Sequence, residues 1–213
     1  MLVNETFASI QGESTHAGRK CFFIRLAGCN LRCSYCDTLY AASPESGKDI
    51  SVDGLVKIAA ASRLSLVEIT GGEPLAQSET PELCKALLDA GFEVLLETNG
   101  SLPIGNIPVA VRKILDCKLP GSGMSEHNLY ANYALLQKHD EVKFVVSDRR
   151  DFDFACETVE KYALPERTAN LIVSPVWGRV SFEDLAAWVI DCRIPLRMQL
   201  QLHKIIWGDK RGV

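Results

Sequence analysis

Short apolar segments alternate with segments of helical pattern along the chain, and this alternation limits the fold more than any other feature of the sequence. The predicted strands are Phe22–Leu26, Leu66–Thr70, Glu93–Glu97, Lys113–Asp116, Val142–Val146, Asn170–Ser174 and Arg197–Leu202. The predicted helices lie near Val52–Ser62, Pro81–Ala90, Asn128–His139, Phe152–Tyr162 and Ser181–Cys192. Strands that are apolar almost throughout and are separated by helices predict a parallel sheet with helices outside it.

The length of the chain decides how far such a sheet can close. A complete barrel of eight βα units usually takes about 250 residues, and this chain has 213. We therefore predict an α/β fold of about six βα units, an incomplete TIM-like barrel that occupies residues 1–213 as one domain. Thr80 with Pro81 predicts one helix start, Gly91 predicts its end, and Ser181 predicts a second helix start.

Composition excludes several classes of function. The chain is 47% hydrophobic and carries a net charge of -4, so non-specific binding of nucleic acid through a basic face is disfavoured. We see no basic and apolar leader at the start and no apolar run long enough to cross a membrane. Eight cysteines without an export signal indicate a reducing compartment. We expect a cytoplasmic protein without nucleic-acid or membrane partners.

Cys29, Cys33 and Cys36 are spaced C-x3-C-x2-C, and the next cysteine is Cys84. A structural zinc site normally takes four ligands, and an electron-transfer 4Fe–4S cluster normally takes four thiolates. Three thiolates favour a 4Fe–4S cluster with one iron free to bind a small molecule. Zinc and unrelated buried thiols remain the alternatives. The other cysteines, except Cys117, are interpreted as small buried apolar residues.

Polar or glycine-rich turns follow five of the predicted strands. They are Gly71–Pro74, Thr98–Gly100, Cys117–Pro120, Ser174–Trp177 and His203–Lys204. Turn chemistry alone explains any one of them. In parallel α/β folds, however, ligands bind at the carboxyl ends of the strands. Five such turns at one edge, together with the cysteine loop, therefore predict a site there.

The cysteine loop after the first strand and Gly71-Gly72-Glu73-Pro74 after the second resemble the radical S-adenosylmethionine superfamily. Within it, Phe7–Ser14, Phe22–Cys29 and Cys36–Thr38 are similar to the 7-carboxy-7-deazaguanine synthase family. The likeness continues through Glu97–Gly100 to Gln199–Lys204 and so spans nearly the whole chain. Some members of the family carry a long insertion between the first two cysteines, and this chain has the short form.

The resemblance implies a lyase of queuosine and deazapurine biosynthesis. Its substrate is 6-carboxy-5,6,7,8-tetrahydropterin, which loses its C6 hydrogen to a radical made from S-adenosylmethionine. The ring then contracts to 7-carboxy-7-deazaguanine, ammonia leaves, and S-adenosylmethionine is regenerated. The implied cofactors are a 4Fe–4S cluster, S-adenosylmethionine and Mg²⁺. A flavodoxin as electron donor and a homodimer are further expectations.

The resemblance also assigns residues, and no catalytic side chain is expected beyond the cluster and the radical. Cys29, Cys33 and Cys36 would bind the cluster, and Thr38 would bind Mg²⁺. S-adenosylmethionine would contact Tyr35, Cys36, Asp37, Gly72, Glu73, Cys117, Lys118, Ser174 and Pro175. The substrate would contact Ile10, Gln11, Gly12, Glu13, Arg25, Thr70, His203 and Val213.

Several of these assignments have structural alternatives. Thr38 could cap a loop, Arg25 could pair with an acidic residue, and His203 could be structural. The tail, about residues 204–213, is expected to fold over the site without a capping helix, and the Val213 carboxylate would then accept hydrogen bonds from the pterin. A short disordered basic end is the alternative.

Two other functions share parts of this pattern. A radical activase that installs a glycyl radical on a partner enzyme shares the cysteine loop. It gives no reason for Gln11–Glu13, Arg25 or the tail. A non-catalytic iron–sulfur carrier or a zinc module would not need the Gly71–Pro74 turn.

Overall fold

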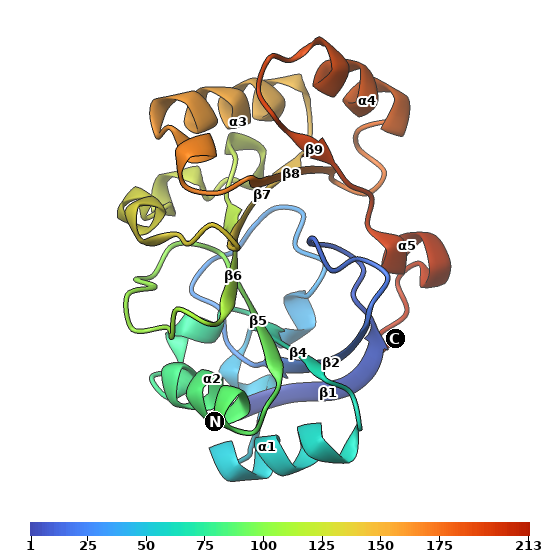
Figure 1. The fold of residues 1–213 in the computed structure, drawn as a ribbon. Coiled ribbons are helices and arrows are strands. Elements are labelled where there is room, and N and C mark those ends of the chain that lie inside the picture. The colour runs from blue at the N-terminus through green and yellow to red at the C-terminus, as the bar shows by residue number, and fades with distance from the viewer.

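Six parallel strands form the centre of a nine-stranded sheet in the computed structural model, which describes all 213 residues (Figure 1). These strands are β2 (Lys20–Leu26), β4 (Leu66–Gly71), β5 (Glu93–Thr98), β6 (Arg112–Cys117), β7 (Glu141–Val146) and β8 (Asn170–Pro175). A short strand β9 (Arg197–Met198) extends them in parallel. On the other side, β1 (Leu2–Ile10) pairs antiparallel with β2, and β3 (Lys48–Asp49) pairs antiparallel with β1. The order is β3-β1-β2-β4-β5-β6-β7-β8-β9, so β3 and β9 are edges and the barrel is open, as predicted.

Four helices lie on the outside of this sheet, and a fifth, short helix contributes to the cavity at the carboxyl ends of the strands. They are α1 (Val52–Ala61), α2 (Thr80–Asp89), α3 (Arg149–Lys161), α4 (Phe182–Asp191) and a short helix α5 (Leu202–Trp207). The Ser181 hydroxyl accepts a hydrogen bond from Asp184 N at 3.0 Å, which confirms the predicted start of α4. Gly91, with φ of +89°, follows α2 and confirms its predicted end. The predicted cap at Thr80 is wrong, because its hydroxyl donates to Pro74 O and Glu79 precedes the helix instead.

The prediction of an α-helix at Asn128–His139 is wrong. Two short 3-10 helices, Ser125–His127 and Tyr130–Leu135, occupy this connection. The buried amide of Asn132 accepts from Ile104 N and donates to the carbonyl groups of Gly100 and Leu102. Asparagine side chains that bond to backbone groups in this way compete with helix formation.

The end of the chain also differs from the prediction. The strand predicted at Arg197–Leu202 ends at Met198, because β9 is an edge strand that pairs only with β8. Helix α5 then follows, so the expectation of a tail without a helix is wrong. Strands β1 and β3 were not predicted. The mixture of polar and apolar residues in β1 matches neither of the patterns that identified the central strands.

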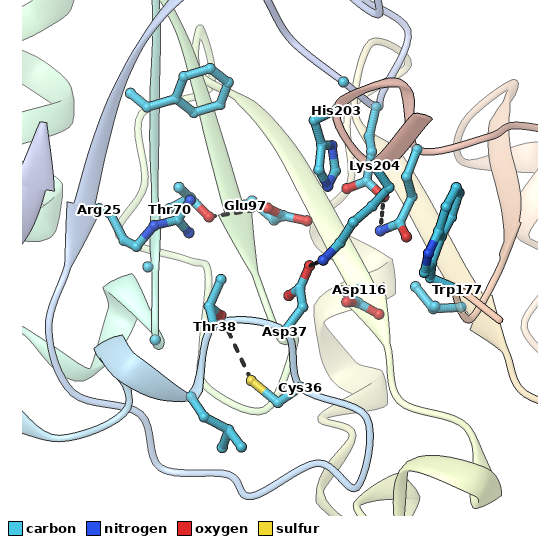
Figure 2. A pocket seen from close by; sticks show the side chains of 18 of the residues that line it. Arg25, Cys36, Asp37, Thr38, Thr70, Glu97, Asp116, Trp177, His203 and Lys204 are labelled. Atoms are coloured by element: carbon cyan, nitrogen blue, oxygen red, sulfur yellow. Dashed lines mark hydrogen bonds and ion pairs between the residues drawn. The ribbon is translucent and has the colours of Figure 1, made fainter. Parts of the chain in front are cut away.

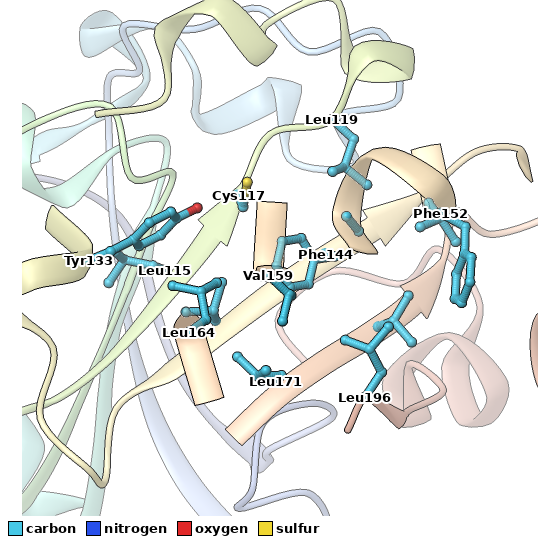
Figure 3. Close-up of a cluster of buried hydrophobic side chains, with 14 of the residues drawn as sticks. Leu115, Cys117, Leu119, Tyr133, Phe144, Phe152, Val159, Leu164, Leu171 and Leu196 are labelled. Carbon is cyan, nitrogen blue, oxygen red and sulfur yellow. The ribbon is translucent and has the colours of Figure 1, made fainter. Parts of the chain in front are cut away.

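Apolar side chains of the strands point outward and pack against the helices in two large clusters. One includes Ile24, Ile69 and Leu96 beneath α1 and α2, and the other includes Phe144 and Val173 beneath α3 and α4 (Figure 3). Because successive side chains of a strand alternate between faces, the neighbouring positions point into the barrel. A third, small cluster around Phe23 and Leu95 fills part of the sheet's inner face. No helix is long and apolar enough to cross a membrane.

We predict that Asn132→Ala destabilises the fold, because it removes three hydrogen bonds to backbone groups and leaves Ile104 N and Leu102 O without a partner, while Gly100 O keeps its bond from Leu129 N. The expected loss is about 2–3 kcal/mol, which lowers Tm by roughly 5–10 °C in a chain of this size. Thermal unfolding measures it. Asn106→Ala, at an exposed position in the connection between β5 and β6, is the control and should change stability by less than about 0.5 kcal/mol. Equal midpoints for the two variants would contradict this role for Asn132.

Candidate active site

A cavity of about 670 Å³ opens at the carboxyl ends of the strands. The cysteine loop, the β1–β2 loop, inward side chains of the strands and the segment from α5 to the C-terminus all line it. Figure 2 shows this convergence, with His203 and Lys204 of α5 facing Arg25, Thr70 and Glu97 across the cavity. The site thus lies at the edge of the sheet that the turns predicted.

The three cysteines of the motif lie on one side of this cavity and are partly exposed to it. The loop that carries them is held by a side chain of its own and by a distant segment of the chain. Arg32 donates to Cys29 O at 2.7 Å, and Ser34 N donates to Ser122 O at 3.0 Å. Cys29 Sγ accepts a hydrogen bond from Leu31 N at 3.4 Å. These hydrogen bonds therefore fix the loop in a position in which its thiols face the cavity.

The donor set fits a 4Fe–4S cluster better than a single metal ion. No three His, Cys, Asp or Glu side chains converge so as to hold one ion, whereas each thiolate of a cubane cluster binds a different iron. Burial raises the pKa of Cys29 and Cys33, and the nearby Lys118 ammonium opposes the shift in both. Iron would replace the thiol protons, as metal binding to cysteine does generally.

The glycine turn after β4 is bound directly to the cysteine loop. Gly72 N donates to Leu26 O at 3.0 Å, and Glu73 N donates to Gly28 O at 2.8 Å. A Cβ atom on Gly72 would lie 2.1 Å from Gly28 O, so only glycine allows this approach. Gly72, which is expected to contact S-adenosylmethionine, lines the cavity.

Glu73 does not line the cavity, although the sequence predicts that it contacts S-adenosylmethionine. Its carboxylate is fully buried and accepts hydrogen bonds from Thr98 Oγ1, Asn99 N and Leu75 N at 2.7–2.9 Å. Burial raises the pKa of Glu73, and these hydrogen bonds oppose the rise. The side chain therefore ties the glycine turn to the end of β5.

Three other residues predicted for the cofactor also lie outside the cavity lining. The Cys117 thiol points outward into the apolar cluster beneath α3, where it contacts Tyr133 (Figure 3). Ser174 and Pro175 are buried in β8. Val176, Trp177 and Arg179, which follow β8, line the cavity in their place, and Lys118 lines it as predicted. The end of β8 therefore contributes to the cavity through the residues that follow the strand.

The residues next to Cys36 in the sequence face the cavity too. Tyr35 donates its hydroxyl to Val145 O at 3.1 Å, and Asp37 lies 3.6 Å from Lys204 Nζ. Thr38 Oγ1 lies 3.7 Å from Cys36 Sγ and makes no capping hydrogen bond. The alternative in which Thr38 caps the loop is therefore not supported, and its hydroxyl is available to a ligand.

The β1–β2 loop brings Ile10, Gln11, Gly12 and Glu13, which are expected to contact the substrate, to the cavity. The Gln11 amide donates to Glu68, so it is held against β4. Gly12 lies against α5, since Leu202 N donates to Gly12 O at 3.0 Å and a Cβ atom on Gly12 would lie 2.3 Å from His203 Nδ1. His203 makes no hydrogen bond of its own and also lines the cavity.

Arg25 points inward from β2. Its Nε donates to Glu5 at 2.9 Å, and its guanidinium carbon lies 5.8 Å and 5.9 Å from the ring centres of Phe7 and Tyr40. The predicted alternative, an ion pair with an acidic residue, is thus present. This ion pair uses only Nε of Arg25. The two terminal nitrogens of its guanidinium group remain available to a ligand in the cavity.

Sequence reasoning missed a group of charged residues inside the barrel. Their inward side chains line the cavity, and they are Glu68, Glu97, Asp116 and Lys143. Each is a charged residue within an otherwise apolar strand, which is the signal that identified Arg25. Thr70, which was predicted, donates to Glu97 at 3.0 Å (Figure 2).

The C-terminal segment lies at the mouth of the cavity, and Gly208–Val213 contribute to its lining. Lys204 Nζ bonds to Asp209 at 2.9 Å, and the guanidinium carbon of Arg211 lies 3.9 Å from the ring centre of Tyr40. These contacts connect the tail to the loop that follows the cysteines.

Comparison with known proteins gives a consistent result. The model of the radical SAM superfamily matches residues 23–188. The 7-carboxy-7-deazaguanine synthase of Chlorobaculum tepidum is 43% identical over 99% of this chain and 96% of its own. That of Koribacter versatilis is 38% identical over the full length of both. A crystal structure of QueE from Escherichia coli has the same fold, with a TM-score of 0.74, 23% identity, and coverage of 95% of this chain and 94% of that one.

We predict that Gly72→Ala impairs loading of the cluster, because the new Cβ atom displaces the cysteine loop at Gly28. After anaerobic reconstitution, iron content should fall to about half of the wild-type value or lower. Gly105→Ala, whose Cβ atom would meet only Leu135 at 3.7 Å, is the control and should load normally. Normal iron content in Gly72→Ala would show that the close approach is not needed.

Proposed function

The chain belongs to the radical SAM superfamily and, within it, to the 7-carboxy-7-deazaguanine synthase family, and from this we propose how its residues carry out that activity. The reaction converts 6-carboxy-5,6,7,8-tetrahydropterin to 7-carboxy-7-deazaguanine and ammonia. When bound, the cluster and S-adenosylmethionine supply the one-electron chemistry that removes the C6 hydrogen. The protein binds, orients and shields the reactants.

One observation supports this proposal above the others: a single cavity joins the cysteine loop to the residues assigned to the pterin. A carrier needs no cavity beside its cluster. An activase must admit a protein segment, whereas here α5 and the tail lie across the mouth. A small substrate fits this arrangement, and the named relatives over the full chain disfavour both alternatives.

On the cofactor side, Cys29, Cys33 and Cys36 would hold the cluster. The turn at Gly71 and Gly72 would offer backbone groups to the methionine part of S-adenosylmethionine, and Lys118 a positive charge for its carboxylate. For the adenosine part we propose Tyr35 and Asp37, with Val176 and Trp177 in place of Ser174 and Pro175. All of the residues in this revised set line the cavity.

On the substrate side, the free fork of Arg25 suits the carboxylate of the pterin, because a guanidinium can bind a carboxylate with two parallel hydrogen bonds. Thr38 would share that carboxylate through Mg²⁺, which takes oxygen ligands and keeps several waters. Gln11, Glu13 and His203 would contact the ring, and Thr70 would fix Glu97 beside it.

The remaining expectations stay predictions. They are a flavodoxin as electron donor, a homodimeric assembly and a cytoplasmic location. The family requires a small-molecule substrate and an electron source, and the chain alone does not specify the latter.

The activity itself is the first test. Anaerobically reconstituted protein with reductant, S-adenosylmethionine, Mg²⁺ and the pterin should form 7-carboxy-7-deazaguanine, detected by mass. Cys33→Ala should abolish product because it removes a cluster thiolate. Cys84→Ala, which changes a buried thiol in the outer core, should retain it. Cleavage of S-adenosylmethionine without deazaguanine would reject this substrate and favour the activase. No cleavage by a fully loaded protein would favour the carrier.

We predict that Arg25→Met weakens binding of the pterin through its carboxylate. KM for the pterin should rise roughly 10- to 100-fold, as expected for loss of a charge-assisted bidentate contact, while affinity for S-adenosylmethionine stays unchanged. Arg149→Met removes an exposed arginine paired with Asp153 and serves as the control with wild-type kinetics. An equal loss of affinity for both ligands in Arg25→Met would indicate a structural role only.

A further inference from the structure

Lys143 is a buried cation that the proposed function leaves unused. It points inward from β7, and its side chain is 6% exposed. Its Nζ donates to Glu13 at 3.0 Å and to Glu97, and it lies 3.9 Å from Asp116. These three carboxylates come from the β1–β2 loop, β5 and β6. One ammonium group therefore ties three separate elements together beneath the cavity.

The electrostatics of this group depend on that one charge. Burial alone would lower the pKa of Lys143, but Glu13, Glu97 and Asp116 raise it well above its ordinary value, so the ammonium persists. Burial also pushes the pKa of Glu97 up, and the charge and hydrogen bond of Lys143 outweigh this and lower it to about 2. Without Lys143, buried carboxylates would face one another uncompensated.

Lys143 also fixes the position of Glu13. It holds one carboxylate oxygen, and the Gln201 amide holds the other at 2.8 Å. Glu13 is thus clamped between β7 and the segment that leads into α5. Each oxygen of a carboxylate has two lone pairs, so both oxygens can still accept a hydrogen bond from a ligand in the cavity.

The charge balance indicates what this group binds. The group contains three carboxylates, those of Glu13, Glu97 and Asp116. It contains two ammonium groups, those of Lys143 and Lys118. Arg25 is left out of this count because it is paired with Glu5. Burial, with the Glu97 charge nearby, raises the pKa of Glu68 well above its ordinary value. Three anions against two cations make a wall rich in acceptors, which suits a ring edge that carries several N–H donors.

We propose that Lys143 is a positioning residue for the substrate: it holds Glu13 and Glu97 as anionic acceptors for the N–H groups of the pterin's aminopyrimidinone ring. This inference rests on the proposed function and deepens it. Lys143 itself touches no substrate atom in this account, and its effect passes through the two carboxylates.

Steady-state kinetics of Lys143→Met in the loaded enzyme test the proposal. Methionine keeps much of the length of the side chain and removes the charge. KM for the pterin should rise about tenfold with kcat at saturation within about threefold, because ground-state binding is lost and the chemistry is not. Affinity for S-adenosylmethionine should not change.

The matched control is Lys113→Met. Lys113 is an equally buried lysine on the adjacent strand β6, and it pairs with Asp140 at 3.0 Å outside the cavity. Lys113→Met should lower Tm without changing KM for the pterin. A Lys143→Met variant that keeps the wild-type KM, or loses pterin and S-adenosylmethionine affinity in parallel, would show that Lys143 only stabilises the fold.

The pH dependence gives a second readout. In the wild type Glu97 stays charged from pH 6 to 8, so its titration should not change KM for the pterin in this range. In Lys143→Met the pKa of Glu97 rises, and KM should increase as pH falls from 8 to 6. The other charged or titratable groups facing this cluster are Glu13, Arg25, Glu68, Asp116, Lys118 and His203. They are present in both proteins, so the difference between the two profiles reports Lys143. A flat profile in the variant would overturn the proposal.

If Lys143→Met alone fails to fold, the double variant with Glu97→Gln decides the question. It removes one negative and one positive charge together, so it should fold. Its KM for the pterin should exceed that of Glu97→Gln alone, because Glu13 has lost the Lys143 ammonium. A KM equal to that of Glu97→Gln alone would overturn the proposal. A loaded wild-type enzyme that cleaves S-adenosylmethionine but never converts the pterin would instead remove the proposed function, and the role of Lys143 with it.

Discussion

The alternation of side chains along the central strands decides where everything else in this molecule lies. Outward positions such as Ile24, Ile69 and Phe144 bury apolar surface against the helices, and that burial stabilises the sheet. The inward positions between them are then free to carry polar groups at the carboxyl ends of the strands. The same alternation explains why Cys117 faces the outer core while Asp116 and Lys118 face the cavity.

Inward charges come at a cost that the molecule offsets by pairing. The three buried cations near the cavity are each paired with a carboxylate: Arg25 with Glu5 and Lys143 with Glu13 and Glu97, all from other elements, and Lys118 with Asp116, two residues before it. Removing one partner of such a pair leaves a desolvated charge, which costs more than the pair contributes. The same contacts join the β1–β2 loop, β5, β6 and β7. The geometry of the site and the packing of these elements therefore depend on each other.

Much of this could be predicted from the sequence, because the strongest signals are local. The apolar strands, the Ser181 cap and the cysteine spacing all act within a few residues, and the structure contains them where expected. The errors arise where distant contacts decide. Asn132 bonds to a loop some thirty residues away and prevents a helix, and Glu73 is drawn to Thr98 and Asn99 rather than to the cavity. The inward charges Glu68, Glu97, Asp116 and Lys143 carried the same signal as Arg25, a charge inside an apolar strand, and could have been found.

The central claim is that, in this cavity, a radical made from S-adenosylmethionine removes the C6 hydrogen of the pterin, and that S-adenosylmethionine is regenerated in the same reaction. The most direct measurement uses pterin deuterated at C6 with the loaded enzyme, followed by mass analysis of recovered S-adenosylmethionine and product. The account predicts deuterium in the recovered S-adenosylmethionine. It also predicts that much less than one equivalent of S-adenosylmethionine is consumed for each molecule of product formed. Unlabelled S-adenosylmethionine, consumed once for each product, would contradict it.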